Sequence, residues 1–308
     1  MAIVLQETLR APFYAPFYAA LALGAYRQEG LDVSLVTAPT PTAAARGFAD
    51  GSVDVAWGGP MRVLKTYEED PDCDLVCFCE VVTRDPFFLI GATANPDFEL
   101  KDLAQLRLAT VSEVPTPWLM LQEDLRRAKL DPDRLQRVSD RSMAENCAAL
   151  RAGAIDVVQA FQPFVEALLE DQAGHIWSAA ADRGPTSYTT LYAPRALLAA
   201  RQQECEAMVR ALYRTLKWVS GADAAALAAA IAGYFPDVPP ARLATALHRY
   251  RALGIWGRDP RLPRQGYERL RAGLLSGGLV ANAMAYERVV DNSLAERVMG
   301  QDPPALKG

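Results

Sequence analysis

Histidine is nearly absent from this chain of 308 residues, in which only His175 and His248 occur. His248 belongs to an arginine-rich helical segment, and His175 follows a glycine in a predicted loop before a tryptophan. Neither follows directly after a predicted strand, where open α/β sheets place their functional groups. The sequence therefore predicts no histidine acid–base centre, and we expect no catalytic residue.

The chain has five cysteines, an odd number that cannot all pair within one molecule and that favours a reducing compartment. Cys73, Cys77 and Cys79 lie close together, but no fourth cysteine or histidine follows at the spacing of a zinc site. Alternation along a strand instead predicts that Cys77 and Cys79 share one buried face. No metal and no other cofactor is expected.

A basic excess, long apolar runs and phosphate-binding loops are also missing. Lys and Arg number 32 against 37 Asp and Glu, a net charge of −5 that disfavours nucleic acid as a partner. No run approaches the roughly 18 apolar residues of a membrane-spanning helix. Neither GxGxxG nor GxxxxGK[ST] occurs where a strand meets a helix, so the sequence lacks the main motifs that indicate binding of dinucleotides or nucleoside triphosphates. The first residues, MAIVLQETLR, do not resemble a secretory signal, so we expect a cytosolic chain or one that has lost a leader.

Strand-like and helical segments alternate through the first two thirds of the chain. Short apolar runs begin with AIVLQ and recur at 31–36, 53–56 and 75–82. Helical patterns at 17–29 and 41–49 lie between them, and each is followed by a glycine. A second series of the same kind runs from FFLIGA to AIDVVQAF, and after the strand TTLYA the chain is almost wholly helical. This order predicts an α/β fold of two lobes with mostly parallel sheets and a helical C-terminal segment.

Polar, aromatic and glycine residues follow four of the predicted strands. Because ligands of open α/β sheets bind outside the carboxyl ends of the strands, these groups predict a binding cleft between the lobes. The candidate binding residues are Glu7, Thr8, Arg10 and Tyr14 after AIVLQ; Trp57, Gly58 and Arg62 after VDVA; Ser112, Glu113, Thr116 and Trp118 after RLATV; and Gln162 after AIDVVQA. Their aromatic rings would enclose a flat ligand, their carboxylates would accept from amino groups, and their guanidinium groups would pair with an anion.

Two N-terminal stretches, APFYAALALGAYRQEGLDVSLV at 15–36 and GFADGSVDVAWGGP at 47–60, resemble a known family. They are similar to the periplasmic solute-binding proteins of ABC importers for nitrate, sulfonates, taurine and thiamine-pyrimidine precursors. LRAGAIDVVQAFQPF at 150–164 and GIWGRDPRLPRQGYERL at 254–270 extend the resemblance over nearly the whole chain.

The resemblance implies the type II periplasmic-binding-protein fold, with two α/β lobes joined by two hinge strands and the helical C-terminal segment packed on lobe one. Lobe one would comprise residues 1–88 and 190–308, and lobe two residues 89–189. The hinges would lie near 82–90 and 187–192. A ligand between the lobes would then close them by hinge motion.

The resemblance also implies that Tyr188, on the return hinge, joins the predicted ligand contacts. Within that family, Glu7 and Glu113 together with Trp57 and Trp118 favour a thiamine-pyrimidine precursor or related heterocycle over a sulfonate or nitrate. The implied protein is a monomeric solute-binding protein of an ABC importer, which captures a small organic solute and presents it to a membrane permease. Its implied location is the periplasm, with the leader absent from this chain. The alternative is a cytosolic enzyme on the same fold, of the thiamine-pyrimidine synthase type or of aromatic-acid metabolism.

Overall fold

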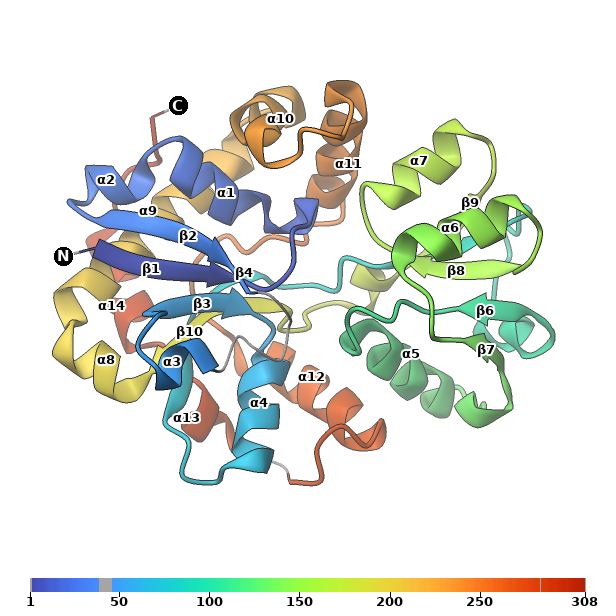
Figure 1. The fold of residues 1–308 in the computed structure, drawn as a ribbon, viewed down its shortest axis with the longest axis horizontal. Helices are drawn as coiled ribbons and strands as arrows, with labels where there is room; N and C mark the ends of the chain where they lie inside the picture. The colour runs from blue at the N-terminus through green and yellow to red at the C-terminus, as the bar shows by residue number, and fades with distance from the viewer. Residues whose placement is uncertain (1, 39–45, 283, 308) are drawn as a thin grey trace.

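The chain folds around two separate five-stranded sheets, which Figure 1 shows side by side. This computed structural model describes residues 2–38, 46–282 and 284–307. The sheet of lobe one has the order β2-β1-β3-β10-β4, and its strands are β1 (Ala2–Glu7), β2 (Asp32–Thr37), β3 (Val55–Gly58), β4 (Leu75–Val82) and β10 (Thr189–Pro194). The sheet of lobe two has the order β7-β6-β8-β5-β9, and its strands are β5 (Phe88–Gly91), β6 (Arg107–Ala109), β7 (Gln136–Val138), β8 (Val157–Ala160) and β9 (His175–Ala179). The predicted α/β fold of two lobes is confirmed.

Helices connect the strands and then form the C-terminal third of the chain. Those of lobe one are α1 (Ala15–Ala22), α2 (Ala25–Gln28), α3 (Arg46–Ala49) and α4 (Pro60–Glu69), and those of lobe two are α5 (Thr116–Arg127), α6 (Met143–Arg151) and α7 (Phe164–Glu170). The C-terminal helices are α8 (Arg195–Ala200), α9 (Gln202–Gly221), α10 (Ala224–Ile231), α11 (Pro240–Ala252), α12 (Arg264–Ser276), α13 (Tyr286–Val289) and α14 (Ser293–Gln301). None of the helices that the structure describes has the length and apolar character needed to cross a bilayer.

The chain passes between the lobes twice. Residues 83–87 lead from β4 to β5, and residues 180–188 lead from β9 back to β10. Phe88 is the first residue of β5 in the lobe-two sheet and Thr189 is the first residue of β10 in the lobe-one sheet, so each proposed lobe boundary falls one residue inside a strand. We keep the division into residues 1–88 with 190–308 and residues 89–189 as a proposal.

The C-terminal helices pack on lobe one, and two of them also reach lobe two (Figure 1). Helix α9 packs on α1, α2 and β4, and α14 packs on α9 and β4. Helix α11 extends to α7, where Arg249 Nε lies 2.6 Å from Glu166 Oε1. Helix α12 lies along α5, so the lobes are held together by helices as well as by the two crossing segments.

The first turn of α12 rests directly on the second crossing segment at Gly266. A Cβ there would lie 2.9 Å from Ser187 Oγ and 3.1 Å from Ser187 N, whose N–H donates to the Gly266 carbonyl at 3.1 Å. We expect Gly266→Ala to lower the free energy of unfolding by about 1–3 kcal/mol, because backbone must move to admit the methyl group. Gly300 in α14 is the control, since a Cβ there meets nothing within 4 Å. Urea denaturation should show Gly300→Ala unchanged or stabilised by about 0.4–1 kcal/mol. Equal effects of the two substitutions would contradict this account of α12.

Three local differences from the sequence expectations have physical causes. The helix predicted at 17–29 is two helices, because Gly24 adopts a left-handed conformation (φ 68°) between α1 and α2. The helix predicted at 41–49 lies mostly outside the described residues, and α3 is its described part. His175 begins strand β9 instead of lying in a loop. This edge strand is exposed or half-buried along its length, so its sequence lacks the alternation that marks a strand.

A bulge in β4 separates two cysteines that were expected on one face. Leu191 of β10 pairs with Cys79 while Tyr192 pairs with Cys77, so β4 has one extra residue there. Cys79 consequently belongs to the largest core cluster, whereas Cys77 belongs to a second cluster that includes residues of α4 and α12. The expectation of a shared face was wrong, whereas the expectation of buried thiols is confirmed.

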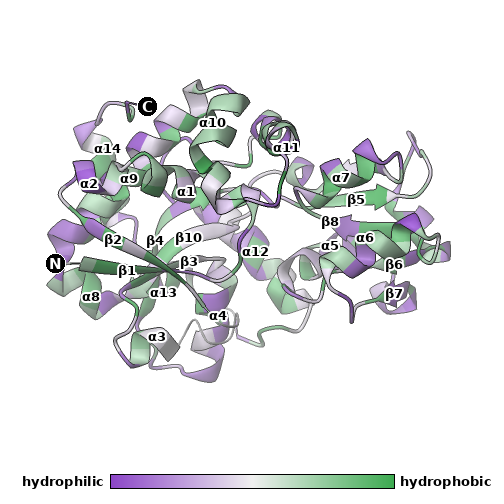
Figure 2. Cartoon of the chain, turned by 45° about the horizontal axis from the view of Figure 1, so that its top comes forward, coloured by the Kyte–Doolittle hydropathy of each residue, from purple (hydrophilic) through white to green (hydrophobic). Residues whose placement is uncertain are grey.

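The largest hydrophobic core continues from lobe one into lobe two. Phe13 joins the two parts, because its ring centroid lies 5.7 Å from that of Phe161 and 6.5 Å from that of Tyr250. Figure 2 shows strands β1, β5 and β8 as mainly hydrophobic and the short edge strand β7 as mainly hydrophilic. This continuous core fixes the relative position of the lobes in the conformation described.

Candidate functional site

Three strands of lobe one bring the predicted site residues to one edge of its sheet. β1 and β3 are parallel, so their carboxyl ends, with Glu7 and Gly58, meet at this edge. β10 runs antiparallel to β3, with Thr190 opposite Gly58. The amino end of β10, with Tyr188 and Thr189, therefore lies at the same edge. We call it the lobe-one edge.

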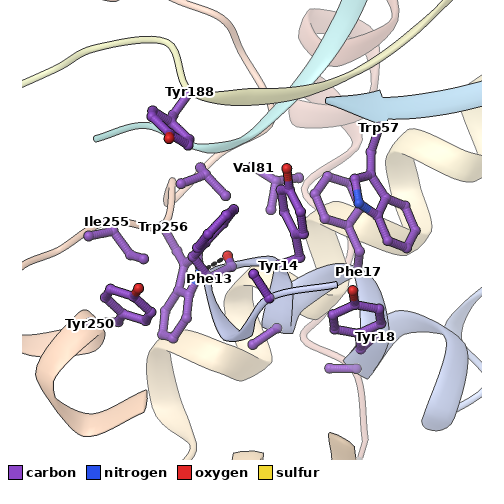
Figure 3. Close-up of a cluster of buried hydrophobic side chains, with 14 of the residues drawn as sticks. Phe13, Tyr14, Phe17, Tyr18, Trp57, Val81, Tyr188, Tyr250, Ile255 and Trp256 are labelled. Atoms are coloured by element: carbon purple, nitrogen blue, oxygen red, sulfur yellow. Dashed lines mark hydrogen bonds between the residues drawn. The ribbon is translucent and has the colours of Figure 1, made fainter. Parts of the chain in front are cut away.

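Tyr14 follows β1, is 5% exposed, and lies next to the rings of Phe17 and Trp57 (Figure 3). Burial raises the pKa of Tyr14 to about 12, an effect that the Arg62 guanidinium and the hydroxyls of Thr189 and Thr8 partly offset. Thr8 Oγ1 and Thr189 Oγ1 are themselves buried and have no hydrogen-bond partner among the residues that the structure describes. Two threonine hydroxyls with unused bonding capacity thus lie near the Tyr14 hydroxyl.

Arg62 crosses the end of β3 from the first turn of α4. A Cβ on Gly58 would lie 3.1 Å from Arg62 Cδ and 3.2 Å from its Nε, so the glycine allows this side chain to lie close to the backbone. Arg62 also lowers the raised pKa values of both Tyr14 and Tyr192, which places its positive charge near the two phenols. The lobe-one edge therefore has a cation beside its hydroxyl groups.

Glu7 is fully buried, and its carboxylate is already hydrogen-bonded. Tyr18 donates to Oε2 at 2.6 Å, Thr37 donates to Oε1 at 2.8 Å, and Arg10 Nε donates to Oε1 at 3.1 Å. Burial and this carboxylate raise the pKa of Tyr18. Arg10, whose side chain is 45% exposed, is thereby fixed against the end of β1. From the sequence, Glu7 was predicted to accept hydrogen bonds from ligand amino groups. In the structure, both of its carboxylate oxygens accept hydrogen bonds from protein side chains.

Trp57 is fully buried in the core, with its ring stacked on Phe17 at 4.7 Å between centroids and 13° between planes (Figure 3). Tyr18 meets it edge-on at 5.5 Å, and Tyr14 lies 6.0 Å away. Its Nε1 is buried and has no partner within the described parts of the chain. The geometry therefore makes the indole N–H, and not the ring face, the part of Trp57 left available for bonding.

The predicted residues of lobe two lie around the start of α5. Ser112 and Glu113 are exposed, and Ser112 Oγ donates to Glu113 at 3.3 Å. The other Glu113 oxygen accepts from the first backbone N–H of α6, that of Met143, at 2.9 Å. Thr116 begins α5, and Trp118 is buried below it with the Arg137 guanidinium 4.2 Å from its ring centroid.

Gln162 and Tyr188 are both buried next to the contact between the lobes. The side chain of Gln162 is fully used by Glu166, because Nε2 donates to that carboxylate at 2.7 Å and Oε1 accepts from its backbone N–H at 3.1 Å. The backbone N–H of Gln162 donates to the Tyr250 hydroxyl at 2.9 Å. The ring of Tyr188 meets Phe13 edge-on at 5.9 Å. Gln162 thus links α7 to α11 through hydrogen bonds to Glu166 and Tyr250. Tyr188 belongs to the second crossing segment, and its ring packs against Phe13.

Sequence reasoning missed Thr189 of β10. It belongs to the run TTLYA, which was recognised as a strand but not placed beside β3. The strand-end rule concerns carboxyl ends, so it could not select the amino end of an antiparallel strand. Only the pairing of β10 with β3 reveals this residue.

The histidines and cysteines do not contribute to this edge. His175 pairs with Gly91 in β9, and His248 is exposed on α11. Burial raises the pKa of each cysteine thiol, to about 11 for Cys147 and Cys205. Within the part of the chain that the structure describes, no group of three or more His, Cys, Asp or Glu side chains could hold a metal ion.

Two sheets joined by two crossing segments, with polar groups at the strand ends beside the junction, define the fold of periplasmic binding proteins. Solved structures agree. The periplasmic aliphatic sulphonate binding protein SsuA from Escherichia coli aligns with a TM-score of 0.75 at 16% identity, covering 94% of this chain and 97% of that protein. The desulfurization enzyme DSZB aligns with a TM-score of 0.73 at 14% identity, covering 98% of this chain and 100% of that protein. The same fold therefore occurs in a binding protein and in an enzyme.

Sequence comparison gives the family. A profile described as NMT1/THI5 like matches residues 11–226, so the chain belongs to the NMT1/THI5-like family. Among curated proteins, it is 24% identical over 300 residues to YtlA of Bacillus subtilis (strain 168), a candidate binding protein, covering 96% of this chain and 89% of YtlA.

Proposed function

We propose that this chain is the solute-binding protein of an ABC importer and that it captures a small organic anion of the sulfonate type at the lobe-one edge. The proposal places the anionic group near Arg62, Thr8 and Thr189. The organic part of the solute would extend toward lobe two. The support comes from the chemistry of the edge and from the binding proteins that share the family or the fold.

The main support for this proposal is the set of hydrogen-bond donors near Tyr14. Among the described residues, the buried hydroxyls of Thr8 and Thr189 and the indole N–H of Trp57 have no partner, and the indole N–H can only donate. Arg62 adds a positive charge beside them. Hydroxyl and indole donors next to a guanidinium favour an oxyanion, because hydrogen bonds to a charged acceptor are roughly twice as strong as neutral ones.

The same geometry weakens the case for an aminopyrimidine. That preference depended on Glu7 and Glu113 accepting hydrogen bonds from ligand amino groups. Glu7 instead accepts from Tyr18, Thr37 and Arg10, and Glu113 accepts from the start of α6. A sulfonate needs donors, which the lobe-one edge offers, whereas an aminopyrimidine needs acceptors that are already in use.

We favour binding over catalysis because neither histidine and none of the five cysteines lies at the lobe-one edge. The fold alone does not separate the two activities, since DSZB is an enzyme. In the proposed role, the protein would release its solute unchanged to a membrane permease outside the cytoplasm.

Isothermal titration calorimetry with ethanesulfonate and ethanesulfonamide tests the proposal. The two probes have nearly the same shape, but only ethanesulfonate is anionic. We expect ethanesulfonate to bind at least tenfold more tightly, which corresponds to about 1.4 kcal/mol, and NMR to show it unchanged after incubation. Binding of an aminopyrimidine without binding of ethanesulfonate would overturn the anion assignment. Conversion of the probe would overturn the binding-protein assignment.

A further inference from the structure

Lobe two contains a cavity of about 510 Å³ away from the lobe-one edge. Its floor is one face of the sheet, where Leu89 of β5 pairs with Gln159 of β8 on one side and with Ser178 of β9 on the other. Leu121 of α5 and Phe98 also line this space. We call this space the lobe-two cavity. Its volume falls within the range of roughly 300–1,000 Å³ that is typical of small-molecule sites.

The lining of the lobe-two cavity is mostly apolar, with one buried polar atom, Gln159 Oε1, that lacks a partner among the described residues. Gln159 is 2% exposed, and its Nε2 donates to the Pro117 carbonyl at 2.9 Å. Its Oε1 is buried and accepts no hydrogen bond from the described chain. A buried amide oxygen without a donor is unfavourable unless something in the cavity supplies one.

Each charged residue that lines the lobe-two cavity is held in an ion pair. Arg183 lies 2.9 Å from Asp85 and 2.5 Å from Asp124. Arg127 pairs with Glu123 at 2.8 Å. Because these charged groups are already in ion pairs and most of the lining is apolar, the cavity favours a neutral molecule.

We propose that the lobe-two cavity is a second binding site, for a neutral and mainly apolar molecule that donates one O–H or N–H to Gln159 Oε1. The occupant is separate from the proposed anionic solute, because Thr8, Tyr14 and Arg62 do not line this cavity. Bicyclic aromatic alcohols have suitable size and carry the required donor.

Calorimetry with 2-naphthol and 2-methoxynaphthalene tests the hydrogen bond to Gln159, because the second probe lacks the hydroxyl donor. We expect wild-type protein to bind 2-naphthol about tenfold more tightly, the effect of one hydrogen bond to a buried acceptor. Gln159→Leu should remove this difference by weakening only the binding of 2-naphthol. Equal affinities of the two probes for wild-type protein would overturn the proposal.

A pair of cavity and control variants locates the bound probe. Ser178→Phe places a ring on the floor of the lobe-two cavity and should weaken 2-naphthol binding more than tenfold. Ser34→Phe makes the same change at an exposed position of edge strand β2 in the other sheet and should leave binding unchanged. Both variants alter edge strands, so circular dichroism on both checks folding. If folded Ser178→Phe binds 2-naphthol as wild-type protein does, the site lies elsewhere and the proposal fails.

Discussion

Arg62→Gln is expected to weaken the binding of ethanesulfonate about 10- to 100-fold. Hydrogen bonds between charged groups contribute about 1.5–3 kcal/mol each, and the substitution removes the positive charge near Tyr14 while keeping a polar side chain. The side chain also packs over Gly58, so a long replacement is needed to fill the space. Titration calorimetry of wild-type and variant protein at the same ionic strength gives the ratio of dissociation constants.

Lys65→Gln is the matched control for Arg62→Gln. Lys65 lies three residues further along α4, its side chain is 44% exposed, and it pairs with Glu69 at 3.7 Å. The control removes the same unit of charge from the same helix but at the solvent-facing side, where screening makes its effect on binding small. Equal losses in the two variants would mean that only the net charge of lobe one matters, and the assignment of Arg62 would fail.

The free energy of unfolding is expected to decrease with rising pH because of Glu80 on β4, and Glu80→Gln should remove that decrease. Glu80 is 1% exposed, and its Oε1 has no partner among the described residues. Burial is the main cause that raises its pKa to about 8; the Ser187 hydroxyl opposes this shift and the negative charge of Asp259 adds to it. The folded protein therefore keeps a proton on Glu80 at neutral pH.

The sign of the effect follows from proton binding in the two states. Between about pH 4.5 and pH 8 the unfolded chain has released the Glu80 proton while the folded protein retains it. Deprotonation thus favours unfolding, by about 1.4 kcal/mol for each pH unit within this window. Above the folded pKa both states are ionised and this contribution becomes constant.

Urea denaturation of wild-type protein and Glu80→Gln from pH 5 to pH 9 measures this effect. We expect the variant to gain stability relative to wild-type protein as pH rises, by on the order of 4 kcal/mol at pH 9. Glu69→Gln is the control, because Glu69 is 66% exposed and its substitution leaves the environment of Glu80 intact. A constant difference between wild-type protein and Glu80→Gln across this range would show that the carboxyl group is ionised in the folded state.

The candidate site was only partly predictable. The strand-end rule selected Thr8, Tyr14 and Arg62, which the structure places together at the lobe-one edge. It also assigned ligand-binding roles to the carboxylates of Glu7 and Glu113. Those roles could not be judged from sequence, because the partners of Glu7 include Thr37, 30 residues away, and the partner of Glu113 is the start of a different helix. These hydrogen-bond partners are the reason why the proposed solute is an anion and not an aminopyrimidine.

The sequence by itself determined the alternation of strands and helices, the two lobes and the burial of Cys77 and Cys79. These features depend on local patterns of apolar residues and on glycines that end helices. Such patterns lie within one segment, so they can be read without knowing the contacts of the rest of the chain. Tertiary structure decided the insertion of β10 between β3 and β4, the contact of α12 with lobe two and the lobe-two cavity. Each of these depends on contacts between segments far apart in the sequence, and such contacts are determined by the packing of the whole chain.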